Sequence, residues 1–379
     1  MKIKTITCHD VYNVGASLQA YALVHYLRQL GHEVEIIDYK PDYLSQHYSL
    51  TNVANPEYDK PVLREVYLLM KFPGRIRNKF SKRKKEYDEF TTVFLPTTER
   101  RYISNDDLKQ RLPEADVYFA GSDQIWNTLF KNGKDPAFYL DFVQKKGVKA
   151  SYAASFATED IAEEWKETVR QWLSDLDFIS VREQSGVNII RKLGIDNAEQ
   201  VLDPVFLLDV DAWTKLEKSV VTEEAYILVY DFDSNERVKT FVKNIAKVNE
   251  WKIYSILPCN YADKCWDQEG PRAFLNLIHN AQFIVSNSFH ATAFSLIFQK
   301  QFAVFERDEK INTRMQDLLK LVGQECRLLR DTNCDIANEK IDYELVLEKL
   351  NYKIKESKDY IDRVLRKAKG NEEENTICD

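Results

Sequence analysis

Short apolar runs alternate with longer amphipathic segments along most of this chain. An apolar run at 3–7 is followed by an amphipathic segment at 16–30, which ends at Gly31, and then by a second apolar run at 34–39. Apolar runs rich in β-branched residues indicate strands, whereas apolar positions that recur every three or four residues indicate helices. A strand, a helix and a second strand in this order predict a parallel pair.

The same alternation continues through both halves of the chain. Further strands are expected at 117–120, 150–156, 178–181, 226–230, 252–257, 283–285 and 302–305, and further helices at 161–173, 236–249, 271–280, 289–298 and 312–321. Because strands that alternate with helices pair in parallel, the pattern predicts the α/β class, with two Rossmann-like domains whose parallel sheets face a central cleft.

The sequence Val-Leu-Asp-Pro at 201–204 marks the expected boundary between the domains, since a proline and a change of rhythm are typical of a linker. We therefore divide the chain into a domain at 1–204, a domain at 205–340, a helix at 341–369 that packs across both, and a tail at 370–379. The tail is polar, and we expect it to be disordered.

Composition and charge narrow the class of protein. The chain has 379 residues, more than one ordinary core holds, and 44% of them are apolar, which is enough for two cores. The net charge of −7 argues against a protein that binds nucleic acid through bulk positive charge. No apolar run approaches the roughly 20 residues that span a bilayer, and the first residues lack the apolar core of a signal peptide, so we expect a cytoplasmic protein.

The six cysteines are scattered and form neither a dense framework nor a CxxC pair. This usage is typical of a protein from a reducing compartment. Cys259 and Cys265 have no histidine between them, so the sequence predicts no metal site there.

Residues 71–85, KFPGRIRNKFSKRKK, place many basic side chains among Phe72, Ile76 and Phe80. We expect them on one long helix that continues to Phe94. Two interpretations stay open. The segment is either the solvated face of a helix, or a basic surface that rests on anionic lipid head groups or receives a phosphorylated, lipid-linked molecule.

The stretch 281–307 carries the clearest sign of chemistry. Its first apolar run stops at 286–288, and an apolar segment of helical length begins at Phe289. Ligands of parallel α/β sheets sit beyond the carboxyl ends of the strands, where the N–H groups of a helix N-terminus attract anions. His290 falls in the first turn of this helix, and histidine is easily tuned to transfer protons near neutral pH. The alternative is that His290 only caps or packs the helix.

The loop at 8–15 also follows an expected strand. It contains His9, Asp10 and Gly15, which could lie at the mouth of the cleft or in a solvated turn. The loop lacks the GxGxxG spacing of a dinucleotide site, so we expect no nicotinamide or flavin cofactor.

Two more strand ends deliver polar side chains. A glycine turn at 121–127 presents polar groups beside an indole, and Arg182 follows the strand at 178–181. An arginine in that place can hold a phosphate or a carboxylate through two parallel hydrogen bonds. The alternative for Arg182 is an ion pair on the surface.

Together these segments resemble a known family. The similar segments, in order, are NVGASLQAYAL at 13–23, GSDQIWN at 121–127, SVRE at 180–183, VLDP at 201–204, FLNLIHNAQFIVSNSFHATAFSLIFQKQF at 274–302 and NTRMQDLL at 312–319. They resemble the polysaccharide pyruvyl transferases over nearly the whole chain. The resemblance implies a GT-B-like fold with the acceptor on the N-terminal domain and the donor on the C-terminal domain.

The activity that the resemblance implies is transfer of the enolpyruvyl carbons of phosphoenolpyruvate to two hydroxyls of a sugar, which yields a pyruvate ketal and phosphate. The sugar would belong to a cell-surface polysaccharide or its lipid-linked precursor. By position, the SFH segment puts His290 at the family's essential histidine, and SVRE puts Arg182 at its donor-binding arginine. Ala291 stands where the family often has glycine, and its methyl group could narrow the approach to the backbone.

This reaction requires an acid that protonates the CH2 carbon of the donor, and His290 is the candidate. Arg182 and the N–H groups after Ser288 would hold the anionic donor. Each hydroxyl that attacks sheds a proton, so a carboxylate base is expected, with Asp10 and Asp123 as candidates. The matching segments add further candidates for substrate binding: Asn13, Gly15, Ser122, Gln124, Ser288, Phe289 and Arg314. The scheme needs no metal and no cofactor, because phosphoenolpyruvate is a donor substrate.

Two other classes of protein share this architecture. A glycosyltransferase would bind a nucleotide sugar, and a non-catalytic sugar-binding module would bind the acceptor without releasing phosphate. The partners that we expect are phosphoenolpyruvate and a sugar acceptor, with lipid linkage and contact with the inner face of a membrane as further expectations from the basic segment. Nucleic acid is not expected.

Overall fold

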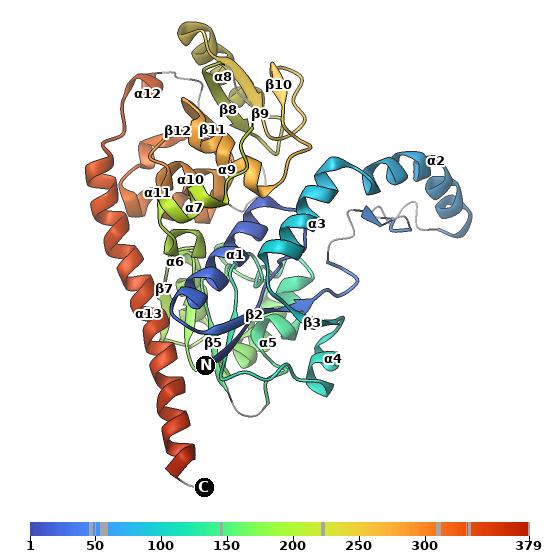
Figure 1. Ribbon diagram of the computed structural model, residues 1–379, viewed down its shortest axis with the longest axis vertical. Coiled ribbons are helices and arrows are strands. Elements are labelled where there is room, and N and C mark those ends of the chain that lie inside the picture. Colours follow the sequence, from blue (N-terminus) through green and yellow to red (C-terminus); the bar gives the residue numbers. More distant parts are fainter. Residues whose placement is uncertain are drawn as a thin grey trace.

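The computed structural model describes residues 1–44, 48–49, 51–53, 60–144, 147–220, 224–307, 312–330, 332 and 335–377. Two α/β units stand one above the other, and one long C-terminal helix runs along both of them (Figure 1).

The N-terminal domain is built on five parallel strands in the order β3-β2-β1-β4-β5. Their bounds are β1 Lys2–Ile6, β2 Glu33–Tyr39, β3 Thr97–Tyr102, β4 Val117–Ala120 and β5 Val148–Ser151. A parallel pair, β6 (Ile179–Val181) and β7 (Ala198–Gln200), lies beside β5 and is joined to it by isolated bridges. The inner strand β4 is buried on both faces, as is typical of a parallel sheet covered by helices on each side.

The helices of this domain connect its strands. They are α1 Val14–Gln29, α2 Pro61–Lys79, α3 Lys82–Phe94, α4 Asn105–Gln110, α5 Glu163–Ser174 and α6 Gln184–Lys192, with short 3₁₀ helices at Asn132–Lys134 and Pro136–Tyr139. The strand expected at 150–156 ends early, at Ser151, because the chain turns there to wrap around the carboxylate of Glu183. Glu183 accepts hydrogen bonds from the backbone N–H groups of Phe156 and Ala157, both at 2.9 Å.

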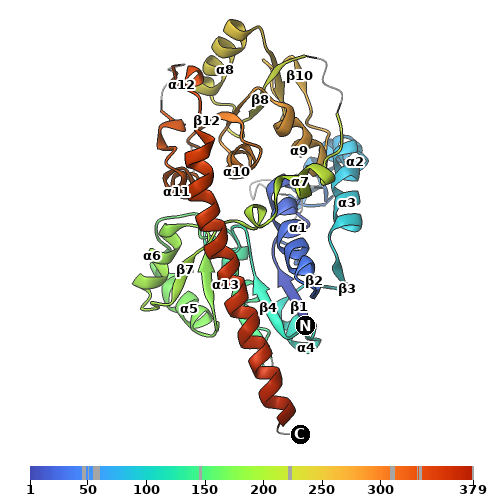
Figure 2. The ribbon, with the colours of Figure 1, turned by 60° about the vertical axis from the view of Figure 1, so that its left-hand side comes forward.

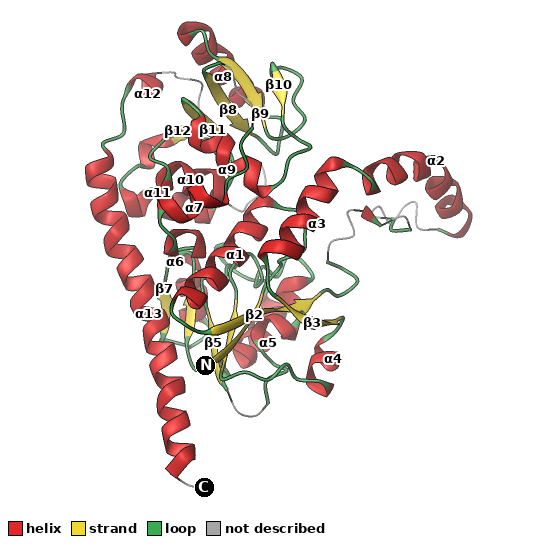
Figure 3. Ribbon diagram, viewed as in Figure 1, coloured by secondary structure: helices red, strands yellow, loops and turns green. Residues whose placement is uncertain are grey.

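The C-terminal domain has a second parallel sheet, with the order β10-β9-β8-β11-β12-β13. Its strands are β8 Tyr226–Tyr230, β9 Lys252–Ser255, β10 Lys264–Cys265, β11 Phe283–Ser286, β12 Gln301–Phe305 and β13 Leu328–Leu329. Its helices are α7 Val210–Leu216, α8 Glu236–Asn249, α9 Pro271–Asn280, α10 Phe289–Ile297, α11 Thr313–Val322 and α12 Asp335–Asn338, with a 3₁₀ helix at Glu325–Arg327. The structure thus contains two parallel sheets with helices packed around them (Figure 3). The predicted α/β class is confirmed.

The expected long basic helix is in fact two helices. The break falls at Phe80 and Ser81, because the Ser81 hydroxyl accepts a hydrogen bond from the Lys84 N–H and so caps a new helix, α3. The first of the two, α2, stands away from the body of the protein (Figure 1), whereas α3 packs back onto the domain through buried Tyr87 and Phe90.

The C-terminal helix α13 spans Tyr343–Ile377 and runs along both domains (Figure 2). In the C-terminal domain the Tyr343 hydroxyl donates to the Ser295 carbonyl at 3.2 Å, and in the N-terminal domain the Tyr360 hydroxyl donates to the Ser151 carbonyl at 2.8 Å. The helix continues into the segment 370–379, where the sequence predicts disorder, as far as Ile377. Beyond Gly370 the chain has glutamates and no proline, and glutamate is a good helix former.

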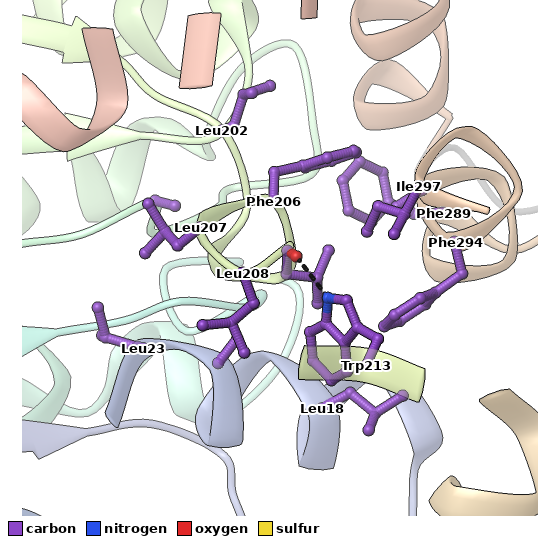
Figure 4. Packing of buried hydrophobic residues seen from close by; sticks show 14 of the residues in the cluster. Leu18, Leu23, Leu202, Phe206, Leu207, Leu208, Trp213, Phe289, Phe294 and Ile297 are labelled. Carbon is purple, nitrogen blue, oxygen red and sulfur yellow. Dashed lines mark hydrogen bonds between the residues drawn. The ribbon is translucent and has the colours of Figure 1, made fainter. Parts of the chain in front are cut away.

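The two domains share one apolar core around the segment between them. The 3₁₀ helix η5 (Pro204–Leu207) and α7 bring Phe206, Leu207 and Trp213 against α1 of the N-terminal domain and α10 of the C-terminal domain (Figure 4). The Trp213 indole N–H donates to the Val205 carbonyl at 3.1 Å, which satisfies the polar atom of a fully buried ring. This shared core holds the N-terminus of α1 against the N-terminus of α10.

Candidate active site

A small pocket lies between the two domains. Its volume is about 130 Å³, and the residues that line it are Asn13, Asp123, Gln124, Phe232, Asn287, Ser288, Phe289, His290, Arg307, Arg314 and Met315. The first three follow β1 and β4 in the N-terminal domain, and the others follow β8, β11 and β12 or begin α11. Both domains therefore present the carboxyl ends of their parallel strands to one concave site, which is where α/β sheets bind ligands.

His290 stands in the first turn of α10, directly after β11. Ser288 caps this helix, since its hydroxyl oxygen accepts a hydrogen bond from the Ala291 N–H at 3.4 Å, while its own N–H donates to the Ser286 hydroxyl at 2.8 Å. The turn is fixed on both sides, so the imidazole has a defined direction. Its Nε2 atom lies 3.6 Å from Oδ2 of Asp203.

Gly15, near the N-terminus of α1, lies against the other side of this imidazole. A Cβ atom built on Gly15 would overlap the His290 ring at Nδ1, Cε1 and Cγ. The sequence predicts Gly15 to bind substrate, whereas the structure places it next to His290 and not along the pocket. Its missing side chain makes room for the histidine.

Asp203 links His290 to the N-terminal domain. It is fully buried and precedes Pro204 at the start of η5, where its Oδ1 atom accepts a hydrogen bond from the Val205 N–H at 3.1 Å. Its Oδ2 atom accepts a hydrogen bond from Arg182 Nη1 at 2.5 Å and also faces His290. Burial alone would raise the pKa of Asp203, but the Arg182 guanidinium and the His290 imidazole lower this pKa to about 2. Asp203 is therefore ionised over the whole physiological range.

Arg182 lies behind the pocket wall and does not line the pocket. Its side chain is 2% exposed, and besides Asp203 it faces Asp123, with 3.5 Å between Nη2 and Oδ1. The guanidinium carbon also lies 4.7 Å from the ring centroid of Phe289. The sequence predicts that Arg182 grips the substrate, but in the structure it faces two carboxylates, because the end of β6 points towards the segment between the domains.

Arg314 borders the pocket in place of Arg182. Because Arg314 offers only donors, the amide of Gln124 must turn its oxygen towards it, and this oxygen then accepts a hydrogen bond from Nη2 at 2.8 Å. Burial and the positive charge of Arg182 lower the pKa of Arg314 to about 10, although Asp123, Glu183 and Asp203 pull in the opposite direction. Arg314 is thus a buried guanidinium, and its Nε atom has no hydrogen-bond partner among the described residues.

Arg307 is the second guanidinium in the pocket lining. It follows β12, and its Nη2 atom lies 3.4 Å from Oδ1 of Asp233. Asn287 lines the same side and donates to Asp231 at 2.7 Å through its amide nitrogen. This side of the pocket therefore combines a cation with side chains held in fixed positions.

The remaining predicted residues divide into two groups. Asn13, Asp123, Gln124, Ser288 and Phe289 line the pocket together with His290 and Arg314. Ser122 does not, since it is buried and its hydroxyl donates to the Ala153 carbonyl at 2.6 Å.

Asp10 also lies outside the pocket. It forms ion pairs with Lys40 and, at 3.8 Å, with Arg101. Both of these cations line a separate and more open pocket of about 720 Å³. Asp10 therefore belongs to a different part of the N-terminal domain from His290.

Sequence reasoning did not single out Asp203 or Arg307. Asp203 lies inside the quoted VLDP segment, but the proline after it suggests a linker and draws attention from the carboxylate. Arg307 comes two residues after the end of β12, so the rule that polar residues at strand ends face the ligand would have found it.

No curated protein sequence matches this chain. Among solved structures, the chain is similar to the S. aureus MnaA–UDP co-structure, with 14% identity, a TM-score of 0.49 and coverage of 92% of this chain and 90% of that one. It is also similar to UDP-GlcNAc 2-epimerase from Methanocaldococcus jannaschii, with 14% identity, a TM-score of 0.48 and coverage of 93% and 92%.

A third similar structure is the E. coli heptosyltransferase WaaC with ADP-2-deoxy-2-fluoro heptose, with 12% identity, a TM-score of 0.37 and coverage of 82% of this chain and 90% of that one. Identities and scores this low give no ground for assigning the ligands of those proteins to this chain.

The comparison with protein families is more specific. The sequence model for polysaccharide pyruvyl transferase matches residues 13–309, which include every strand of both sheets except β1 and β13 and every residue of the pocket except Arg314 and Met315. The chain belongs to the polysaccharide pyruvyl transferase family.

Proposed function

We propose that this transferase moves the enolpyruvyl carbons of phosphoenolpyruvate to two hydroxyls of one sugar, releasing phosphate and leaving a pyruvate ketal. The observation that carries the proposal is the convergence of His290, Arg307 and Arg314 on one small pocket at the N-terminus of α10. A proton donor and two cations around a space of this size suit a small, strongly anionic donor.

The anionic groups of the donor match the cations of the pocket. Phosphoenolpyruvate carries a phosphate and a carboxylate, and planar guanidinium groups bind both through paired hydrogen bonds. Arg314 is a buried guanidinium in the pocket lining whose Nε atom has no partner among the described residues, and the N-terminus of α10 adds N–H groups and the positive end of a helix dipole. The volume of about 130 Å³ supports a small donor over a nucleotide sugar, because drug-sized ligands occupy pockets of about 300 Å³ or more.

His290 is the proton donor in this proposal. A proton moves from the imidazolium to the CH2 carbon of the donor, which becomes a methyl group and leaves an oxocarbenium-like centre on the neighbouring carbon. The ionised carboxylate of Asp203, at 3.6 Å from Nε2, stabilises the positively charged ring and fixes its orientation. Arg182 acts through Asp203, since it holds this carboxylate in place.

The sugar closes the ketal in two attacks. The first hydroxyl adds to the oxocarbenium carbon and loses its proton to a base. The second hydroxyl forms the other C–O bond as the bond from this carbon to the phosphate oxygen breaks, and the second proton leaves with the phosphate. Of the two predicted bases, Asp123 lines the pocket and Asp10 does not, so we assign the base role to Asp123.

The test is a reaction of the full chain with phosphoenolpyruvate and a panel of nitrophenyl glycosides and lipid-linked sugars. We expect one inorganic phosphate for each sugar that gains the mass of a pyruvate ketal. Phosphate release that does not depend on the sugar would point to a phosphatase and contradict the proposal.

Thermal denaturation in the presence of each ligand distinguishes phosphoenolpyruvate from a nucleotide sugar as the donor. Phosphoenolpyruvate should raise the melting temperature, because a ligand that binds only the folded state stabilises it. Arg314→Gln should abolish this rise, since the substitution removes the guanidinium that borders the pocket. A rise with a nucleoside diphosphate and none with phosphoenolpyruvate would favour a glycosyltransferase.

A further inference from the structure

The helix α2 exposes apolar side chains that nothing in the described part of the chain covers. It stands away from the body as an arm (Figure 1). Leu69 is 77% exposed and Met70 is 76% exposed, and exposed apolar side chains that lie together mark an interaction site. The exposed apolar residues of the arm are Leu63, Val66, Leu69, Met70, Phe72, Ile76 and Phe80.

Most of these residues fall on one face of the helix. With 3.6 residues per turn, the positions 63, 66 and 70 lie together, and 69, 76 and 80 continue the same side. We call these six residues the apolar stripe. A helix of a soluble protein normally turns such a stripe towards the core, but here the stripe faces outward.

The opposite face of α2 is the one that contacts the protein. Arg75 donates to the Asn52 carbonyl at 2.6 Å, and Arg64 lies 3.4 Å from the Thr51 carbonyl. Tyr67, on the same side, stacks under the Arg75 guanidinium at 5.7 Å. The polar contacts thus hold the arm with its apolar stripe directed away from the chain.

The arm is strongly basic as well as apolar. Residues 61–79 contain five basic side chains and a single acidic one, Glu65. Among the basic residues, Arg64, Lys71, Arg77 and Lys79 are exposed. At 3.6 residues per turn Arg77 lies on the stripe side, and the other three lie on the remaining face. A helix with an apolar stripe and several exposed cations fits the surface of an anionic bilayer, where the stripe enters the acyl boundary and the long basic side chains reach the head groups.

We propose that α2 docks in the plane of an anionic membrane surface through the apolar stripe. A second copy of this chain is a poorer occupant, because pairing two arms would bring like charges together. The arm lies on the surface and does not cross it, since no helix among the described residues is long and apolar enough to do so. The proposal does not depend on the reaction proposed above.

The test is flotation of the full chain with vesicles of phosphatidylcholine, with and without phosphatidylglycerol. We compare the wild type with Leu69→Glu/Met70→Glu on the arm. The matched control is Val248→Glu/Leu345→Glu, which changes two apolar residues that are 80% and 58% exposed on α8 and α13 and adds the same charge. Because both pairs of residues are exposed, neither change should lower the melting temperature.

We expect the wild type and the control to bind vesicles that contain phosphatidylglycerol with affinities within about twofold of each other. The affinity of the arm variant should be lower by about tenfold or more. Leu63→Glu/Val66→Glu, at the other end of the stripe, should repeat this loss. Equal losses of vesicle binding in the arm variant and the control would mean that only the net charge of the protein matters, which would overturn the proposal. A wild type that binds no vesicles would overturn it too.

Analytical ultracentrifugation tests whether a second copy of this chain, and not a membrane, covers the apolar stripe. If the wild type forms dimers that the arm variant cannot form, and neither binds vesicles, then the stripe is a contact between copies of this chain and the membrane proposal is wrong. Loss of vesicle binding in a variant that sediments like a monomeric wild type supports it.

Discussion

Two buried histidines of this chain face a carboxylate in almost the same way, yet their surroundings differ. In the loop after β11, His290 Nε2 lies 3.6 Å from Asp203, and in the loop after β1, His9 Nε2 lies 3.5 Å from Asp38. Both follow a parallel strand. By sequence alone, both were candidates for a place at the cleft.

The difference lies on the other edge of each ring. His9 Nδ1 lies 3.3 Å from the Thr7 carbonyl, so both of its nitrogens face protein oxygens. The Nδ1 edge of His290 passes over Gly15 and the ring lines the pocket beside Arg314. A histidine–carboxylate pair is therefore not enough for acid catalysis, which also needs an open ring edge and a place for the reacting atom.

Removing each imidazole gives the largest expected contrast. His290→Ala should lower turnover with phosphoenolpyruvate and a sugar about hundredfold to ten-thousandfold, the usual effect of losing a general acid. His9→Ala should keep turnover within about tenfold and instead lower stability, because it leaves a cavity and removes one of the two partners of Asp38, the other being Arg101. Phosphate release and urea denaturation measure the two effects. Comparable turnover losses in both variants would erase the distinction between the two pairs.

The two carboxylates should differ next. Asp203→Asn leaves the buried Arg182 without its closest anion, and breaking a buried ion pair costs about 3–5 kcal/mol. Asp38→Asn should cost less, about 1–2 kcal/mol, because Asp38 and its partner Arg101 are partly exposed. Urea denaturation of both variants gives these values.

Activity separates positioning from stability. If Asp203 orients His290, then Asp203→Asn should lower kcat about hundredfold with little change in the KM for phosphoenolpyruvate, measured at a temperature where the variant is folded. A rise in KM without a fall in kcat would mean that Asp203 contributes to binding of the donor and does not orient the His290 imidazole.

Gly15→Ala should have a smaller and more local effect. The new methyl group would overlap the His290 ring, so the imidazole must move, and a shift of this size should lower kcat about tenfold to hundredfold. Gly74→Ala is the matched control, because a Cβ there has open space and a helix favours alanine by about 1 kcal/mol. Steady-state kinetics of both variants make the comparison.

A double variant isolates the clash. The same overlap should lower the free energy of unfolding of Gly15→Ala, and adding His290→Ala should restore much of that stability in urea denaturation, since the two residues are in contact and their effects are not additive. Additive losses would place the strain elsewhere.

The sequence predicted those features that depend on local pattern. The strand at 226–230 and the helices at 236–249 and 271–280 have the predicted bounds, because apolar periodicity and flanking proline or asparagine define them. His290 was placed in the first turn of a helix after a strand, and it lies there.

Features that depend on contacts between distant segments could not be predicted in this way. Asp203 looks like part of a linker until the fold brings Arg182 and His290 to its two sides. Periodicity shows that α2 has an apolar stripe, but not that Arg64 and Arg75 bind the loop and turn this stripe outward. The catalytic roles of His290 and Asp123 remain predictions.

Acid unfolding tests the charge on which the His290 arrangement depends. The pKa of Asp203 is lowered to about 2 in the folded protein, whereas an unfolded aspartate has a pKa of about 3.9. The folded state therefore favours the ionised form, and the resulting stability, about 2 kcal/mol, is fully present above about pH 4 and is lost as the pH falls through 2. The pKa of Asp38 is also lowered, since hydrogen bonds from His9 and Arg101 outweigh its burial, so its contribution is lost on acidification too.

Asp203→Asn should flatten the slope of unfolding free energy between about pH 4 and pH 2 by the amount that this one carboxylate contributes. Denaturant titrations across this range measure the slope, and an unchanged slope would mean that Asp203 is not held ionised between Arg182 and His290.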